Sequence, residues 1–187
     1  IEDVDRGAKV GLRWARGPFE LMNRVGVLKS FEMAQDYLKL CQDESGKSNW
    51  QIPEFFAKQA SNNQKWDFSY VDTEISNGIA TITINRPEAM NALNETVIHQ
   101  LGNAVDAVNS NDEVHTMVLD GAGKAFIAGA DVKFFVDKIR SDSIPDIVEF
   151  TSNGHKVLNS IENSPKTTIA LTTGLALGGG LELALCC

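Results

Sequence analysis

The chain has 187 residues, of which 43% are hydrophobic and 22% charged, and its formal net charge is −8. This composition is ordinary for a globular protein and excludes an intrinsically disordered chain. The negative charge argues against a broad surface for nucleic acid or anionic membranes, so no nucleic-acid partner is predicted. Three cysteines without a C-x-x-C pattern fit a reducing compartment, and a cytoplasmic protein is predicted.

The first 45 residues are predicted to be helical. A helix ends near Trp14, Gly17-Pro18 makes a turn, and the proline starts the next helix, because proline is well tolerated at a first helical position. A further helix is predicted after a cap at Ser30, because apolar residues recur at three- and four-residue steps. These residues are Phe31, Ala34, Leu38 and Cys41.

Residues 16–22 carry a more specific pattern, Arg16-Gly17-Pro18-Phe19-Glu20-Leu21-Met22, with Gly26 after it. The pattern resembles the C-terminal helical domain of 3-hydroxyacyl-CoA dehydrogenases, although it also describes an ordinary helix, turn and helix. The resemblance implies that residues 1–45 are the end of such an all-α domain. Its NAD-binding half would precede Ile1, so the chain is expected to be a fragment of a longer protein.

Residues 46–67 are predicted to be a linker, because they are mostly polar and include Pro53. Phe55 and Phe56 indicate a short helix within this range that docks on another part of the protein. A second domain is then expected over residues 68–187.

The second domain is predicted to be α/β and to open with a β-hairpin. Strands at 70–75 and 79–84 flank Asn77-Gly78, the residues that favour a tight type I′ turn. Asn94 is predicted to cap the next helix, and the apolar run 114–119 indicates a buried strand. The apolar stripe of that helix consists of Val97, Leu101, Ala104, Val105 and Val108.

A loop of exposed backbone amides is predicted after the strand at 114–119. Its sequence is Lys124-Ala-Phe-Ile-Ala128-Gly129-Ala130-Asp131-Val-Lys133, with a helix starting near Asp131. Another helix begins at a Ser143 cap with Pro145 and ends near Ser164-Pro165. It is followed by a strand at 167–173.

The most informative segment is Gly174-Leu-Ala-Leu-Gly178-Gly179-Gly180-Leu-Glu182-Leu-Ala-Leu-Cys186. Glycines at a strand-to-helix turn allow a ligand to approach the backbone, and the first amides of a helix lack partners within it. Glu182 lies three residues after Gly179, so both share one helix face. The segment therefore predicts an oxyanion donor beside a general base, within a buried strand, turn and buried helix.

Two other interpretations of this segment are possible from the residues alone. A membrane helix with small residues at Gly174 and Gly178 is disfavoured, because three consecutive glycines each cost about 1 kcal/mol in a helix interior. The threonines before the turn also favour a strand. A carboxylate paired with a distant basic residue would be the better interpretation of Glu182 in the absence of the loop at 124–133.

Together the two loops resemble the crotonase (enoyl-CoA hydratase/isomerase) superfamily, whose members share an A-G-A-D loop and a G-G-G-x-E segment about fifty residues later. Ile82-Thr-Ile-Asn85-Arg86-Pro87-Glu-Ala-Met-Asn91-Ala92-Leu93 is similar to that family's opening motif. The resemblance implies a partial crotonase-like ββα spiral, truncated over residues 68–187. With the dehydrogenase segment before it, the order resembles an archaeal-type bifunctional enzyme.

The resemblance implies the roles of the site residues. A thioester carbonyl would accept hydrogen bonds from the N–H groups of Ala130 and Gly179, and Glu182 would be the first of two acid/base glutamates. The second would lie about twenty residues further on, past Cys187, so this fragment alone is expected to be inactive. Substrate-binding residues are expected at Ala128, Gly129, Ala130, Asp131, Val132, Lys133 and Gly178.

The implied activity is the reversible hydration of 2-enoyl-CoA, joined to NAD-dependent 3-hydroxyacyl-CoA oxidation by the mostly absent dehydrogenase part, in fatty-acid β-oxidation. A CoA thioester is the expected substrate, with no cofactor in this fragment. No metal site is predicted, because His99, His115 and His155 lack metal-ligand spacing. A homo-oligomer, a trimer or a dimer of trimers, is expected. The alternatives are an enoyl-CoA isomerase and a non-catalytic assembly module.

Overall fold

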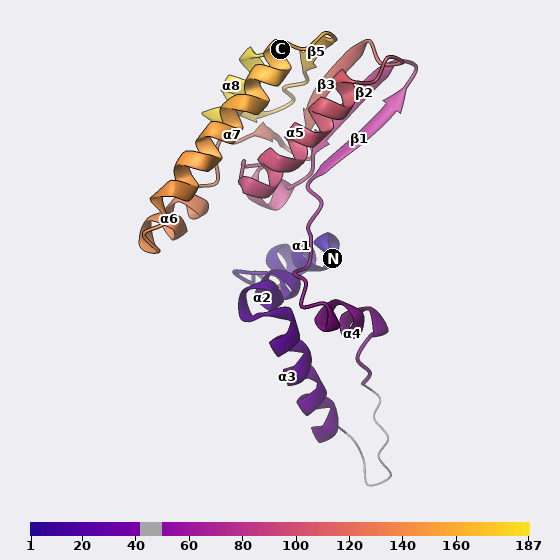
Figure 1. Cartoon of the computed structure of the whole chain (residues 1–187), viewed down its shortest axis with the longest axis vertical. Coiled ribbons are helices and arrows are strands. Elements are labelled where there is room, and N and C mark those ends of the chain that lie inside the picture. The colour runs from indigo at the N-terminus through magenta and orange to yellow at the C-terminus, as the bar shows by residue number, and fades with distance from the viewer. Residues whose placement is uncertain (42–49) are drawn as a thin grey trace. The chain divides into compact units, whose positions relative to one another are not determined.

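The computed structural model describes residues 1–41 and 50–187, which form two compact units. Unit 1 spans Ile1–Phe68 and unit 2 spans Ser69–Cys187. Figure 1 shows helices alone in unit 1 and a sheet with helices in unit 2. The predicted domain boundary at residue 68 lies within one residue of this division, whereas the predicted start of the linker at residue 46 lies outside the described residues.

Unit 1 contains four described helices. They are α1 (Glu2–Gly11), α2 (Pro18–Val25), α3 (Val27–Leu40) and α4 (Glu54–Ser61). The proline at the start of α2 was predicted, and Gly17 precedes it as the N-cap. The short helix expected at Phe55 and Phe56 is α4, which packs against α3 although it lies in the range predicted to be a linker.

The predicted cap at Ser30 is wrong, because α3 begins earlier, at Val27. Gly26, with φ at +104°, separates α3 from α2, and the Ser30 hydroxyl donates back to the Gly26 carbonyl at 2.8 Å. Val27 is buried against Phe56 and Trp66 in the core of unit 1. Tertiary packing of Val27 therefore extends the helix past the local capping signal.

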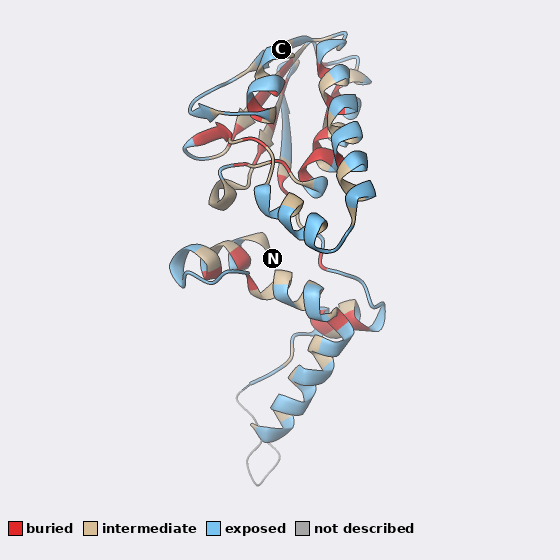
Figure 2. Cartoon of the chain, turned by 90° about the vertical axis from the view of Figure 1, so that its left-hand side faces the viewer, coloured by how far each residue is buried: buried red, intermediate tan, exposed pale blue. Residues whose placement is uncertain are grey.

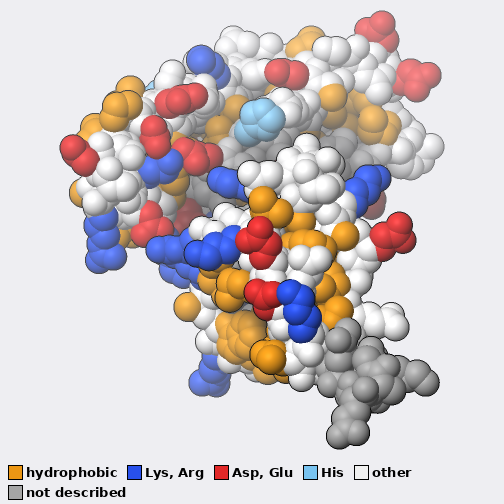
Figure 3. All heavy atoms as spheres, turned by 60° about the horizontal axis from the view of Figure 1, so that its bottom comes forward, with side chains coloured by type: hydrophobic (Ala, Val, Ile, Leu, Met, Phe, Trp, Pro, Cys, Tyr) orange, Lys and Arg blue, Asp and Glu red, His pale blue; other side chains and the backbone are white. Residues whose placement is uncertain are grey.

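The core of unit 1 is small. Its buried cluster consists of Val27, Phe56, Ala60 and Trp66. Many large apolar side chains of the unit, including Trp14, Leu28 and Leu40, remain exposed. Figure 3 shows hydrophobic side chains on the surface of the chain. Over residues 1–41 and 50–187, no helix combines the length and hydropathy that crossing a bilayer requires.

We expect Asp5→Ala to destabilise unit 1 by about 3 kcal/mol, since bonds to a charged acceptor contribute roughly 1.5–3 kcal/mol each. Asp5 is 1% exposed, and its two carboxylate oxygens accept the N–H groups of Phe19 and Glu20 at 2.8 Å each, at the start of α2. Urea unfolding followed by tryptophan fluorescence reads this unit, which holds all three tryptophans. Asp3→Ala, at a 95% exposed side chain, is the control. Equal midpoints for the two variants would contradict the expectation.

Unit 2 is built on a four-stranded sheet in the order β1-β2-β3-β5 and a small sheet in which β4 pairs with β6. The strands are β1 (Val71–Ser76), β2 (Ile79–Ile84), β3 (Thr116–Gly121), β4 (Ala125–Ile127), β5 (Thr167–Ala170) and β6 (Leu175–Ala176). The helical elements are the 3-10 helix η1 (Pro87–Ala89) and the helices α5 (Glu95–Asn109), α6 (Val132–Arg140), α7 (Ile144–Glu162) and α8 (Gly179–Leu185).

The hairpin β1-β2 is confirmed. The two strands are antiparallel, and Asn77 and Gly78 both have positive φ, as a type I′ turn requires. From β2 onward the pairings are parallel, β2 with β3 and β3 with β5. The strand-helix-strand order predicted from the sequence thus produces a mainly parallel sheet.

One face of the main sheet is buried beneath helices. Alternate residues of β2 and β3 are buried, as the two-residue period of a strand dictates. The predicted stripe of α5 lies on this side, although Ala104 is only half-buried, and α5 also packs against α7. Figure 2 shows the buried positions gathered in the strands and on the inner side of α5.

Three sequence predictions in unit 2 need correction. The strand predicted at 114–119 runs from Thr116 to Gly121, and the strand predicted at 167–173 ends at Ala170. The C-terminal strand and helix, predicted to be buried, expose Ile169 at 45% and Leu181 at 49%. An apolar run predicts burial only if another layer covers it, and the main contacts of α8 are with β4, β5 and β6 on its inner side.

Candidate active site

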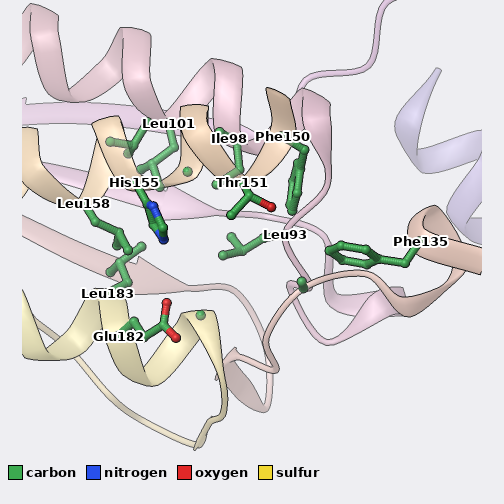
Figure 4. A pocket seen from close by; sticks show the side chains of 14 residues that line it. Leu93, Ile98, Leu101, Phe135, Phe150, Thr151, His155, Leu158, Glu182 and Leu183 are labelled. Carbon is green, nitrogen blue, oxygen red and sulfur yellow. The ribbon is translucent and has the colours of Figure 1, made fainter. Parts of the chain in front are cut away.

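A cavity of about 220 Å³ lies between α5, α6, α7, α8 and the loop before α6. Figure 4 shows its side chains. The lining residues are mostly apolar, and three of them, Ala130, Gly179 and Glu182, are the residues predicted to be catalytic. The two loops identified in the sequence therefore open onto one space.

The loop before α6 leaves the N–H of Ala130 without a hydrogen-bond acceptor among the described residues. Leu93 forms a parallel β-bridge with Ala130 through the two residues that flank Ala130. The Leu93 N–H donates to the Gly129 carbonyl and the Asp131 N–H donates to the Leu93 carbonyl, at 2.8 Å each. In a parallel bridge the central residue points its own N–H away from the bridging strand. Among the described residues, the N–H of Ala130 has no acceptor.

The glycine turn leaves a second amide open. Gly179 is the first residue of α8, and the N–H groups after it are used, that of Gly180 by the Leu177 carbonyl and that of Glu182 by the Gly178 carbonyl. The Gly179 N–H has no acceptor within residues 1–41 and 50–187. It is one of the orphan donors that every helix start leaves.

The two loops contact each other at a glycine from each, Gly129 and Gly178. Gly129 and Gly178 have φ of +88° and +47°, in the left-handed region. A Cβ added to Gly129 would lie 3.1 Å from the Leu177 carbonyl oxygen and 3.9 Å from the Gly178 Cα. The missing side chains therefore let the loops approach closely enough for both free amides to line one cavity.

We expect Gly129→Ala to weaken binding of acetoacetyl-CoA at least about tenfold, because a non-glycine residue in the left-handed region costs roughly 1–2 kcal/mol. The added methyl group would also press on the Leu177 carbonyl and separate the loops. Calorimetric titration measures the affinity. The control is Gly7→Ala, where an added Cβ meets nothing within 4 Å. Unchanged affinity in the Gly129 variant would mean that the loop contact does not set the site.

Glu182 brings a free carboxylate to the same cavity. The residue is exposed, and among the described residues its carboxylate makes no hydrogen bond or ion pair. The interpretation as a carboxylate paired with a basic residue is therefore not supported here. One helical turn later, burial, followed by the charges of Glu162 and Glu182, raises the pKa of the Cys186 thiol. Cys186 is thus disfavoured as a thiolate nucleophile near the site.

A buried polar network holds the Ala130 loop. Arg86 Nη2 pairs with Asp131 Oδ2 at 2.8 Å, with both side chains largely buried, and Arg86 Nη1 donates to the Ala92 carbonyl at 3.0 Å. Asp131 Oδ1 accepts the Lys133 N–H at 3.0 Å and so caps α6, the predicted helix start. The Asp131 side chain is thereby engaged in fixing the loop.

Asn91 makes a second, fully buried set of contacts behind the loop. Its Nδ2 lies within hydrogen-bond distance of the carbonyls of Ala122, Ala125 and Phe126, at 2.9, 2.9 and 3.1 Å. Its Oδ1 accepts the Arg86 N–H at 2.9 Å. The asparagine of the N-A-L motif therefore connects the segment after β2 to β4 and its approach.

The remaining predicted substrate-binding residues lie on the two loops but do not line this cavity. They are Ala128, Gly129, Asp131, Val132, Lys133 and Gly178. Val132 and Lys133 are exposed at the start of α6. Their contribution to substrate binding stays a prediction.

Sequence reasoning missed two polar residues of the cavity wall, Thr151 and His155 on α7. They stand four residues apart and share a helix face with apolar neighbours, a spacing that could have drawn attention to them. Only the fold shows that this face turns toward Glu182. His99 and His115 do not line the cavity, and no cluster of three or more metal-ligating side chains occurs among the described residues.

Comparison with known proteins gives a consistent result. A family model described as enoyl-CoA hydratase/isomerase matches residues 79–187. A crotonyl-CoA hydratase of Syntrophomonas wolfei is 44% identical over 110 residues, which are 58% of this chain and 41% of that protein. A mitochondrial methylglutaconyl-CoA hydratase of Homo sapiens is 41% identical over 115 residues, 61% of this chain and 33% of that protein.

Solved structures are similar over the same part. An enoyl-CoA hydratase from Bacillus halodurans matches with a TM-score of 0.61 at 31% identity, covering 64% of this chain and 48% of that one. An enoyl-CoA hydratase/carnithine racemase from Magnetospirillum magneticum matches with a TM-score of 0.59 at 35% identity, covering 65% and 45%. The chain thus spans less than half the length of these relatives, and the family model leaves residues 1–78 outside its match.

Proposed function

We propose, from the premise that this chain belongs to the enoyl-CoA hydratase/isomerase family, that the protein adds water reversibly to 2-enoyl-CoA thioesters. The observation that carries the proposal is that two backbone amides and one carboxylate, all without partners among the described residues, meet in a single apolar cavity. Such a set can hold a negatively charged oxygen and transfer a proton beside it.

In the proposed reaction the thioester carbonyl accepts hydrogen bonds from the N–H groups of Ala130 and Gly179. Water adds to the β-carbon, and the charge that develops on the carbonyl oxygen is stabilised by both donors. Removing one oxyanion donor typically costs about 2.7–4 kcal/mol of transition-state stabilisation. Glu182 acts as one of two acid/base groups, and CoA is part of the substrate, so no cofactor is required.

The second acid/base group is proposed from the family resemblance alone. It would lie about twenty residues after Glu182, a position past Cys187. Complete turnover is therefore proposed to need such a residue in addition to Glu182, whereas thioester binding is proposed to need only the two amide donors.

An enoyl-CoA isomerase is the closest alternative. It shares the two amide donors, but isomerases of the family generally depend on the other carboxylate position, so Glu182 favours hydration. A non-catalytic assembly module is the alternative from a different class. It is disfavoured by the free amides and free carboxylate, which a purely structural domain does not need.

The test measures hydration of crotonyl-CoA and conversion of a 3-enoyl-CoA to its 2-enoyl isomer by the natural protein. We expect hydration to dominate. Isomerisation without hydration would favour the isomerase, and neither activity would favour the assembly module. For the 187-residue chain, calorimetry with acetoacetyl-CoA against free CoA should give thioester-dependent binding.

We also keep the dehydrogenase origin of residues 1–45 as a proposal, supported only by the sequence pattern at residues 16–22. It predicts NAD-dependent oxidation of 3-hydroxybutyryl-CoA by the natural protein, and the absence of that oxidation would contradict it. A trimer or dimer of trimers is proposed for the crotonase part from the family resemblance, and sedimentation tests it.

A further inference from the structure

We propose that Thr151 and His155 make this cavity selective for short acyl chains that carry a hydroxyl group beyond the β-carbon. The inference rests on the proposed function, since it names the substrate class of the same site. It starts from the two polar residues in an otherwise apolar wall that have no part in the reaction described above.

His155 and Glu182 are the two ionisable residues that line the cavity. Figure 4 shows its ring and the Glu182 carboxylate pointing toward each other from α7 and α8. In the described part of the chain, neither ring nitrogen of His155 has a hydrogen-bond partner. A neutral imidazole therefore offers one donor and one acceptor to a molecule that enters between the two helices.

Thr151 lies one helical turn before His155, and its hydroxyl already donates its hydrogen bond within the helix. Its hydroxyl donates to the Ile147 carbonyl at 2.9 Å, within α7. The proton of that hydroxyl is thereby used, and the oxygen retains lone pairs that can accept a hydrogen bond. A ligand group that donates to Thr151 is thus better matched than one that only accepts.

A hydroxyl group satisfies both residues, because it can accept from His155 and donate to Thr151. A carboxylate could accept from the imidazole, but it would face the oxygen of Thr151 and add a second negative charge to a cavity that already holds Glu182. A plain alkyl chain offers no hydrogen bond to His155 or Thr151, both of which are exposed to the space that it enters, so it lacks the contacts that a hydroxyl group makes. A neutral hydroxyl is therefore the favoured tail.

The size of the cavity limits the chain. At about 220 Å³ it is smaller than the roughly 300–1,000 Å³ of most ligand sites. Its size therefore favours a short acyl chain, of about five carbons with one oxygen, over a long one.

The test compares dissociation constants of unreactive saturated thioesters by calorimetry. The probes are pentanoyl-CoA, 4-hydroxypentanoyl-CoA, 5-hydroxypentanoyl-CoA, glutaryl-CoA and free CoA. We expect at least one hydroxyl probe to bind about five- to tenfold more tightly than pentanoyl-CoA, the ratio typical of one net hydrogen bond.

Single-residue variants show whether Thr151 and His155 cause the tighter binding of the hydroxyl probes. His155→Leu and the isosteric Thr151→Val should each bring the hydroxyl probes to the affinity that the same variant shows for pentanoyl-CoA. Asn159→Leu, one turn further along α7 and outside the cavity, is the matched control and should keep the preference. Equal loss in the control would assign the effect to the helix and not to the two residues.

The remaining outcomes separate this inference from the function it rests on. If crotonyl-CoA is hydrated but the hydroxyl probes have no advantage, the inference alone is overturned. If glutaryl-CoA binds most tightly and His155→Leu removes that binding, the tail is a carboxylate and the hydroxyl assignment is wrong. If no thioester binds better than free CoA and no hydration occurs, both proposals fail.

Discussion

Replacing Glu182 by Gln is expected to lower the rate of crotonyl-CoA hydration by about 10²- to 10⁴-fold, the usual contribution of a positioned acid/base group. The amide has the shape of the carboxylate but cannot take up the proton. Because the Glu182 carboxylate makes no hydrogen bond or ion pair with the described residues, replacing it by an amide removes no side-chain contact. The natural protein is assayed for the turnover number, and acetoacetyl-CoA affinity is measured in parallel.

The pattern of the two measurements decides the role of Glu182. A large loss of turnover with nearly unchanged affinity indicates an acid/base group, whereas an equal loss of both would indicate a binding role. Glu162→Gln, at an exposed residue of α7 outside the cavity, is the control and should keep the native rate. A Glu182 variant as active as this control would refute the assignment.

Replacing Asn91 by Leu is expected to destabilise unit 2 by about 4 kcal/mol or more, because each buried polar group left unpaired costs roughly 1–3 kcal/mol. The change removes the donor facing the carbonyls of Ala122, Ala125 and Phe126 and the acceptor for the Arg86 N–H. Asn91 is fully buried and has φ of +57°, which asparagine tolerates better than leucine.

Hydrogen exchange measured on peptides covering residues 114–131 is the direct readout of this prediction, since the lost bonds end on that segment. We expect its protection to fall with the unfolding midpoint. Asn103→Leu, on the exposed side of α5, controls for added apolar surface. Native protection in the Asn91 variant would mean that water or a shifted loop replaces the amide.

Features that depend on neighbouring residues could be predicted well from the sequence. The Asn77-Gly78 hairpin is present, and the Asn94 side chain accepts the Val97 N–H at 2.9 Å as the predicted cap of α5. The helix start at Asp131 and the turn of helix between Gly179 and Glu182 also match. Each of these rests on hydrogen bonds or periodicity within a few residues, which the local order of side chains determines.

Predictions that depended on a distant partner were less reliable. The cap at Ser30 was overruled by the packing of Val27 against α4. The burial expected for Leu181 failed because an apolar run carries no information about the layer that would cover it. Both errors arise where tertiary contacts compete with local preference.

The sequence by itself determined the functional groups of the site, which are the backbone amides of two glycine-containing loops and one carboxylate. It also determined the family resemblance that links these two loops. Only the tertiary structure brought Gly129 against Gly178, about fifty residues apart, turned His155 toward Glu182 and placed Thr151 in the same cavity wall. The same holds for the contacts of Asn91 with three carbonyls beyond β3. The physical reason is that such contacts depend on the pairing of strands and the packing of helices far apart in the chain, for which no local pattern provides a signal.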